Sequence, residues 1–73
     1  MDQIVLSLRE CSDGWRVFQA ESPLFWSPTY GMAMDSARCL AALHVDLREV
    51  PAVILMQLLG EAPVEVTRLA PGH

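Results

Sequence analysis

The chain has 73 residues, the size of one domain, and 52% of them are apolar, which excludes an intrinsically disordered protein. The net charge is −4 and the basic residues are isolated arginines, so the clustered basic surface that nucleic-acid binding requires is missing. Cys11 and Cys39 are too few for a zinc site, and neither a signal peptide nor a membrane-spanning run is recognisable, which favours a cytoplasmic protein with reduced thiols.

The first predicted element is a β-hairpin. In residues 3–9 apolar side chains fall at every second position, which is the period of a half-buried strand. Residues 12–14 read S-D-G, a turn signal, and residues 15–20 form the return strand.

The length of this turn decides which side chains face the helix. A three-residue loop pairs Cys11 with Trp15 and places Phe18 on the same side as Leu8. A two-residue Asp-Gly turn would shift the register by one and would bring Trp15 and Val17 to that side instead. We favour the three-residue loop because it groups more apolar side chains on the helix-facing side.

Residues 21–28 are predicted to be an irregular connection, because Pro23 and Pro28 both disfavour regular strand pairing. Large apolar side chains gather between and just after the two prolines. The candidate partner-binding residues are Leu24, Phe25, Trp26 and Tyr30. Aromatic side chains are frequent hot spots of protein interfaces, which favours this role. The alternative is that the segment folds back as a lid on the core.

Residues 29–44 are the one long predicted helix. Its apolar face follows spacings of three and four, and consists of Tyr30, Ala33, Met34, Ala37, Leu40, Ala41 and His44. The opposite face is more polar, and Thr29 can serve as the N-cap. The alanines on the apolar face predict that the helix lies close to the element that it covers.

The second half of the chain is predicted to return to the sheet. A separate helical turn is expected at 46–50, since Asp46 and Glu49 have the spacing of a capping box. Residues 52–59 form an apolar run that suits either a strand or a helix. The strand is favoured, because turn residues follow it and the alternating residues 64–69 complete a second hairpin.

These elements predict a single α+β domain over residues 1–73 in β-β-α-β-β order, with an antiparallel sheet and the helix on one face. A strand at 52–59 is apolar on both sides, whereas one helix covers one face only. The uncovered face carries Val53, Leu55 and Leu59, which are therefore the predicted dimer contacts. A domain this small is marginally stable alone, which also favours a homodimer.

Two stretches resemble a known family. Residues 14–18, G-W-R-V-F, and residues 29–41, T-x-x-x-A-M-x-x-A-R-x-L-A, are similar to the β-β-α core of HicB-type antitoxins. The helix match depends on Thr29, Ala33, Met34, Ala37 and Arg38. Small bacterial proteins with a G-W-x-V strand and an A-R-x-L-A helix share the pattern. The resemblance implies a partial ribonuclease-H-like unit without catalytic carboxylates, and a regulator that contacts a toxin or nucleic acid.

No residue pattern assigns a reaction. Cys39 and His44 are five positions apart, so they lie on different faces of the helix, and a nucleophilic cysteine needs a base within hydrogen-bond reach. No catalytic residue, metal ligand or cofactor is predicted. We expect a non-enzymatic cytoplasmic bacterial protein that acts through protein–protein contact, as a homodimer, with neither a membrane nor nucleic acid as its partner. The alternative is the HicB-antitoxin-like regulator.

Overall fold

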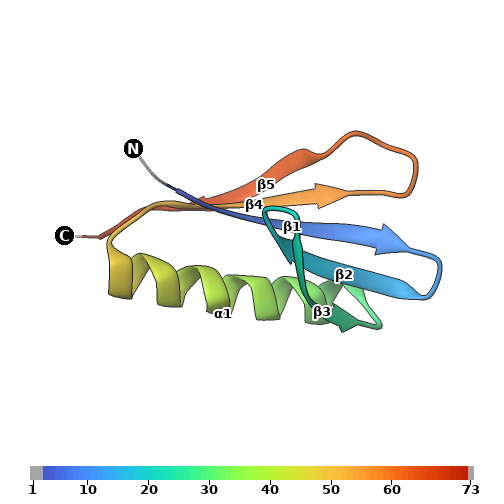
Figure 1. Cartoon of the computed structure of the whole chain (residues 1–73), viewed down its shortest axis with the longest axis horizontal. Helices are drawn as coiled ribbons and strands as arrows, with labels where there is room; N and C mark the ends of the chain where they lie inside the picture. Colours follow the sequence, from blue (N-terminus) through green and yellow to red (C-terminus); the bar gives the residue numbers. More distant parts are fainter. Residues whose placement is uncertain (1–2, 73) are drawn as a thin grey trace.

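One helix covers one face of a five-stranded sheet in the computed structural model, which describes residues 3–72 (Figure 1). The elements follow the chain as β1 (Ile4–Cys11), β2 (Gly14–Gln19), β3 (Ser22–Ser27), α1 (Tyr30–Arg48), β4 (Ala52–Gln57) and β5 (Val64–Leu69). The strands lie side by side as β3-β2-β1-β4-β5. The predicted α+β class with one helix on one face is confirmed, but the order is β-β-β-α-β-β instead of β-β-α-β-β.

The strand missing from the sequence prediction is β3. It lies at an edge of the sheet, where proline is tolerated because its missing N–H removes no bond from the sheet interior. Pro23 pairs with Phe18, beside a register shift between Val17 and Phe18. The turn before β3 carries no glycine, and Ala20 takes the left-handed conformation with φ of 55°. The prediction of an irregular connection over 21–28 is therefore wrong.

This extra strand also decides the direction of the second half of the sheet. β1 and β3 run the same way, because β2 is antiparallel to both. The 19 residues of α1 span about 28 Å and carry the chain back, so β4 starts at the same end as β1 and pairs with it in parallel. With two strands ahead of the helix, β4 would have run antiparallel to β1. The sheet is mixed, and the prediction of a purely antiparallel sheet is wrong.

The first hairpin has a two-residue turn between β1 and β2. Cys11 pairs with Gly14 and Leu8 with Val17, so the turn consists of Ser12 and Asp13. The favoured three-residue loop and the alternative Asp-Gly turn are both wrong, although the alternative correctly places Trp15 and Val17 on the side of the helix. Trp15 and Val17 belong to the cluster under α1. Phe18 lies on the opposite face of the sheet, where the guanidinium of Arg9 stacks on its ring. Grouping the apolar side chains on one side predicted the wrong register, because Phe18 packs on the outer face beneath Arg9.

α1 packs on the sheet through small side chains, as predicted. Ala33, Ala37 and Ala41 are fully buried, four residues apart on one face of the helix. The largest fully buried side chains of the sheet lie in the same cluster and are Leu6, Leu8, Val17 and Ile54. Thr29 caps the helix, since its hydroxyl accepts a hydrogen bond of 3.2 Å from the N–H of Met32.

The helix is longer than predicted. It continues past His44 to Arg48, and Glu49 ends it in the left-handed conformation while its N–H donates to the oxygen of Val45 at 2.9 Å. The separate helical turn at 46–50 is therefore wrong. Continuing the helix buries Val45, which is 6% exposed, whereas a break at that position would expose it.

The strand interpretation of the apolar run is confirmed, since its first six residues form β4, and β5 matches the predicted range. Leu58 and Leu59 lie outside the strand, in the connection to β5. Along β4, Ala52 and Ile54 join the cluster under α1, and the alternation of a strand places Val53 and Leu55 on the face that points away from α1. We call that face the outer face of the sheet.

Candidate protein-interaction surface

The outer face of the sheet is shielded by its own side chains. Val53 is 4% exposed and Ser7 is 6% exposed, although no second layer from residues 3–72 covers this face. The guanidinium carbon of Arg9 lies 4.1 Å from the ring centre of Phe18, and Nη2 of Arg9 lies 3.3 Å from a carboxylate oxygen of Glu21. The long side chain of Arg9 therefore covers the ring of Phe18 on this face.

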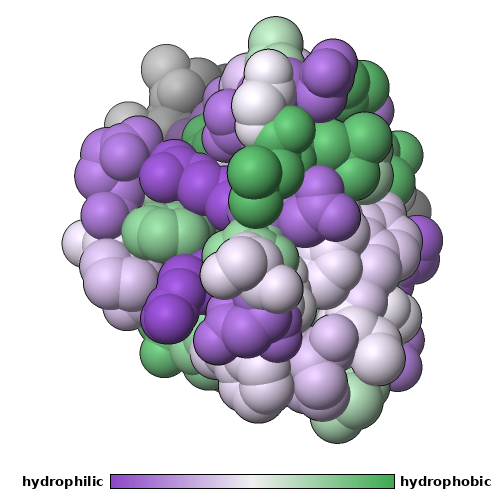
Figure 2. Space-filling model, turned by 90° about the vertical axis from the view of Figure 1, so that its right-hand side faces the viewer, coloured by the Kyte–Doolittle hydropathy of each residue, from purple (hydrophilic) through white to green (hydrophobic). Residues whose placement is uncertain are grey.

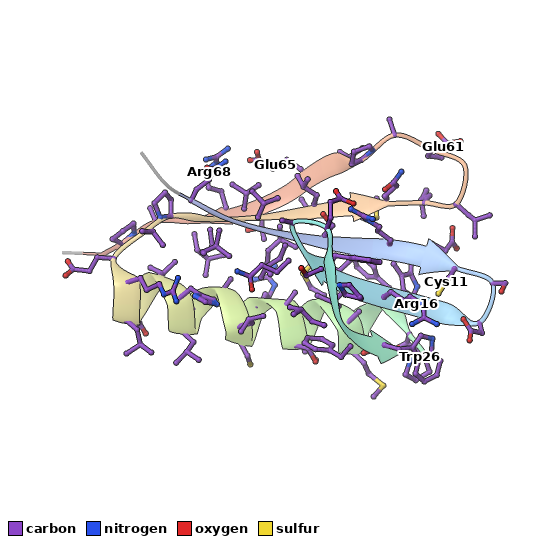
Figure 3. All side chains as sticks on the ribbon, in the orientation of Figure 1. Cys11, Arg16, Trp26, Glu61, Glu65 and Arg68 are labelled. Carbon is purple, nitrogen blue, oxygen red and sulfur yellow. The ribbon has the colours of Figure 1, made fainter. Side chains whose placement is uncertain are left out.

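An ion pair also lies on the outer face of the sheet at β5. Nη2 of Arg68 lies 2.9 Å from Oε1 of Glu65, and both side chains project to the side away from α1 (Figure 3). The predicted dimer contacts are dispersed on this side of the molecule. Val53 is shielded, Leu55 is half-buried, and Leu59 lies in the β4–β5 connection with 62% of its surface exposed.

The structure separates the four predicted partner-binding residues. The exposed fractions are 40% for Leu24, 37% for Phe25 and 44% for Trp26, whereas Tyr30 is half-buried. Phe25 pairs with Val17 and so faces the side of α1. Trp26 pairs with Arg16 and faces the other way, next to Arg16 at the end of the sheet (Figure 3). Phe25 and Trp26 therefore point to opposite faces of the sheet.

Two of these rings are engaged within the chain. The ring of Tyr30 meets that of Trp15 edge-on, with 5.0 Å between the ring centres, and so fixes the start of α1 on the sheet. Trp26 lies against Gly14, where a Cβ atom would be 2.8 Å from the indole nitrogen and 2.5 Å from the backbone oxygen of Ser27. Gly14 also has a φ of 148°, so this position requires glycine. Phe25 is the aromatic residue of this segment that lines the open surface beside α1.

An open groove of about 520 Å³ lies between β3 and α1. It is lined by Phe25, Asp35, Ser36, Cys39, Leu40 and Leu43. Apolar side chains form most of its walls, and Asp35 contributes a carboxylate. A groove of this kind can receive an apolar side chain from a partner.

The side of α1 beside this groove carries a second apolar stripe. Three large side chains on it are well exposed: 54% for Met32, 53% for Leu43 and 74% for Leu47. We call Met32, Ser36, Cys39, Leu43 and Leu47, which recur at spacings of four and three, the outer stripe of α1. Figure 1 shows this helix with its outer side uncovered.

Sequence reasoning misses the outer stripe for two reasons. Ser36 and Cys39 make this face look polar beside the charged Asp35 and Arg38, and Leu47 falls outside the predicted helix. The stripe can be recognised on a helical wheel that extends to Arg48. On that wheel Leu43 and Leu47 lie on the same side as Met32 and Cys39.

A second group of exposed apolar residues lies at the β4–β5 end of the molecule. The group comprises Leu58, Leu59, Val64 and Val66. Figure 2 looks at this end and shows hydrophobic side chains gathered in its upper part. A carboxylate oxygen of Glu10 accepts a hydrogen bond of 2.8 Å from the N–H of Leu59, which ties the connection to β1. This end is a narrow hairpin tip, whereas the outer stripe lies on a rigid helix beside a groove.

Reactive side chains are scattered. Cys39 is exposed in the groove, whereas His44 is half-buried further along the helix. Within residues 3–72 no group of three or more His, Cys, Asp or Glu side chains could hold a metal ion. In that same part of the chain, no helix has both the length and the apolar character needed to cross a bilayer.

Comparison with known proteins finds no matching family model, no matching curated protein and no matching solved structure.

Proposed function

We propose that this chain is a non-enzymatic protein–protein interaction module that acts as a homodimer in the bacterial cytoplasm. The observation that carries the proposal is the apolar surface formed by the outer stripe of α1 and Phe25. It combines large exposed side chains, a rigid helix and an adjacent groove. The largest exposed apolar patch of a soluble protein is often functional, so a surface of this kind favours a partner.

The size of this surface sets the expected strength of association. Its four large side chains are Phe25, Met32, Leu43 and Leu47. From their exposed fractions they present roughly 400 Å² of apolar surface per copy. A standard interface buries about 800 Å² per partner, so the surface matches the small end of specific interfaces, where transient complexes are found.

The oligomeric state tests the proposal. Sedimentation velocity, measured from low micromolar to millimolar concentrations, is expected to show a monomer that converts to a dimer as the concentration rises. A monomer over the whole range would overturn the homodimer. Light scattering coupled to size exclusion provides the mass independently of molecular shape.

A second candidate function is a HicB-antitoxin-like regulator that contacts a toxin or nucleic acid. Arg9 and Arg16 are directly opposite each other on the outer face, and Trp26 is the neighbour of Arg16 on β3. An arginine beside an exposed indole is an arrangement on which bases can stack. The net charge of −4 opposes this role.

A mobility-shift assay at low salt separates the two candidates. Duplex DNA and RNA pools are the probes, and Arg16→Ala is compared with Arg48→Ala, which removes an exposed arginine from the end of α1 instead. A shift that Arg16→Ala alone weakens would support the regulator. The absence of a shift with every pool would end the nucleic-acid part of this candidate.

A further inference from the structure

We infer that the two copies of the proposed homodimer meet through the outer stripe of α1, with the helices antiparallel and a two-fold axis that passes between Cys39 and Leu40. The inference rests on the proposed homodimer and adds the surface, the direction and the centre of the contact. The occupant is a second copy of this chain. A two-fold contact uses the same patch on both copies, so the patch must be complementary to itself.

The order of large and small side chains along the stripe provides this complementarity. In an antiparallel pair, positions equally far from the axis lie level with each other. Ser36 then faces the partner's Leu43, so a large side chain meets a small one. Met32 faces the partner's Leu47 at the ends of the contact. A parallel pair would instead place Leu43 against the partner's Leu43, and Ser36 against its counterpart, which packs one end tightly and leaves the other end empty.

The centre of the stripe allows the helices to approach closely. Cys39 is small and exposed, and Leu40 and Leu43 line the groove toward Phe25. Small residues at a crossing point permit short distances between helix axes. The apolar side chains of the partner helix would then pack against Phe25 from outside, which covers the groove without inserting a new segment.

The edge of the sheet is a poorer route to the dimer. β3 is a six-residue edge strand that contains Pro23, and its register with β2 is interrupted between Val17 and Phe18. Short length, proline and a bulge are devices that keep edge strands from pairing with another chain.

Charge opposes the contact without excluding it. Each copy carries a net charge of −4, and Asp35 and Asp46 flank the stripe. Salt at about 0.15 M screens charges that are farther apart than about 8 Å, so association is measured at this ionic strength. The apolar stripe itself contains no charged side chain.

The first test introduces one charge on each of two surfaces of similar exposure. Leu43 is 53% exposed on the outer stripe, and Leu59 is 62% exposed in the predicted alternative dimer face. Leu43→Asp is expected to weaken dimerisation about 30-fold or more, since a charge then replaces a large apolar side chain one helical turn from the axis. Leu59→Asp is expected to change the dissociation constant less than about threefold. Both positions are exposed, and circular dichroism verifies that each variant is folded.

The second test uses the cysteines as reporters of the axis. Cys11→Ser leaves Cys39 as the sole thiol, and copper-phenanthroline with dissolved oxygen removes two electrons and two protons from two thiols to form a disulfide. A covalent dimer is expected, because Cys39 and the partner's Cys39 lie beside the axis. Cys39→Ser leaves the half-buried Cys11 and is expected to form no covalent dimer under the same oxidation.

The third test determines direction. In a background without native cysteines, Met32→Cys and Leu47→Cys chains are mixed and oxidised, and mass spectrometry identifies the products. The antiparallel contact predicts linkage between the two different variants, whereas linkage of each variant to itself would overturn it. A dimer that survives Leu43→Asp but is lost with Leu59→Asp would overturn this geometry and leave the homodimer intact. A wild-type monomer would overturn both.

Discussion

The outer face of the sheet and the outer side of α1 both point away from the core, yet they are built differently. On the sheet face Val53 is 4% exposed beside its cross-strand partner Arg68, which forms an ion pair with Glu65. The helix side has smaller residues at its centre and large apolar side chains that stand in solvent, with Leu47 74% exposed. The sequence predicts an exposed outer face of the sheet, but that face is shielded. The outer side of α1 looks polar in the sequence, but it exposes large apolar side chains.

This difference shows that a count of apolar residues does not locate an interface. Long side chains on a strand lie across their neighbours and cover them, since adjacent strands are about 4.8 Å apart. On the outer stripe of α1, by contrast, Met32, Leu43 and Leu47 stay 53–74% exposed although they lie on one face of the helix. An interaction surface is therefore more readily found on α1 than on the sheet.

The largest expected effect is a loss of stability when the contact between Gly14 and Trp26 is disturbed. Gly14→Ala places a Cβ atom 2.5 Å from the backbone oxygen of Ser27 and against Trp26, at a φ of 148°. We expect a loss of about 3 kcal/mol or more in the free energy of unfolding, measured by urea titration. Gly31→Ala on α1 is the matched control, because no atom lies within 4 Å of its Cβ position. That variant is expected to gain about 0.5–1 kcal/mol, and equal effects of the two changes would contradict the account.

A smaller loss of stability is expected when one side chain is truncated on the outer face of the sheet, and a still smaller one when a side chain is truncated on the outer stripe of α1. Val53→Ala removes buried methyl groups from the outer face, and we expect a loss of about 1–2 kcal/mol in the free energy of unfolding. Leu47→Ala removes more atoms from an exposed site and is expected to change this free energy by less than about 0.5 kcal/mol. Urea titration at a concentration where the chain is monomeric gives both values. If Val53→Ala were as mild as Leu47→Ala, the outer face would not be closed.

The arginine cover should contribute about 1 kcal/mol. Arg9→Ala removes the cation above Phe18 and the ion pair with Glu21, and it uncovers the Phe18 ring. Binding of an apolar dye at the outer face should then increase. Arg38→Ala is the control, because Arg38 is exposed on α1. A dye signal that rises equally in both variants would argue against the cover.

The smallest expected effect concerns the β4–β5 end. Glu10→Ala removes the acceptor of the hydrogen bond from the N–H of Leu59, with an expected loss of about 0.5–1 kcal/mol in the free energy of unfolding. Hydrogen exchange of the Leu59 amide should accelerate. Glu61→Ala is the control, since the backbone oxygen of Glu61, which accepts from Gln57, is unchanged. Unchanged exchange at Leu59 in the Glu10 variant would show that this tie does not hold the connection.

The sequence predicts the elements whose evidence is local. The alanine face, the Thr29 cap and the alternation in β5 identify their own elements, because spacing and capping act within a few residues. Local patterns could not predict β3. Pro23 is tolerated only where a strand lies at an edge of the sheet, and the edge position depends on the arrangement of all the strands. The direction error in β4 followed from the missed strand.

The candidate surface was half predictable. Phe25 is recognisable from the sequence as an exposed aromatic residue, and it does line the groove. Trp26 and Tyr30 look equivalent to Phe25 in the sequence, but strand alternation and the contact with Trp15 assign them elsewhere. Leu43 and Leu47 join the surface only when the end of the helix is known to be Arg48, since each turn of helix adds to the stripe.

The most direct test of the central claim is a dilution series followed by the methyl resonances of the leucines, valines and methionines. The account predicts that the methyl signals of Met32, Leu43 and Leu47 shift together as the concentration rises, while those of Val53 and Leu55 stay in place. Concentration-dependent shifts of Val53 and Leu55, with stationary signals from α1, would contradict it.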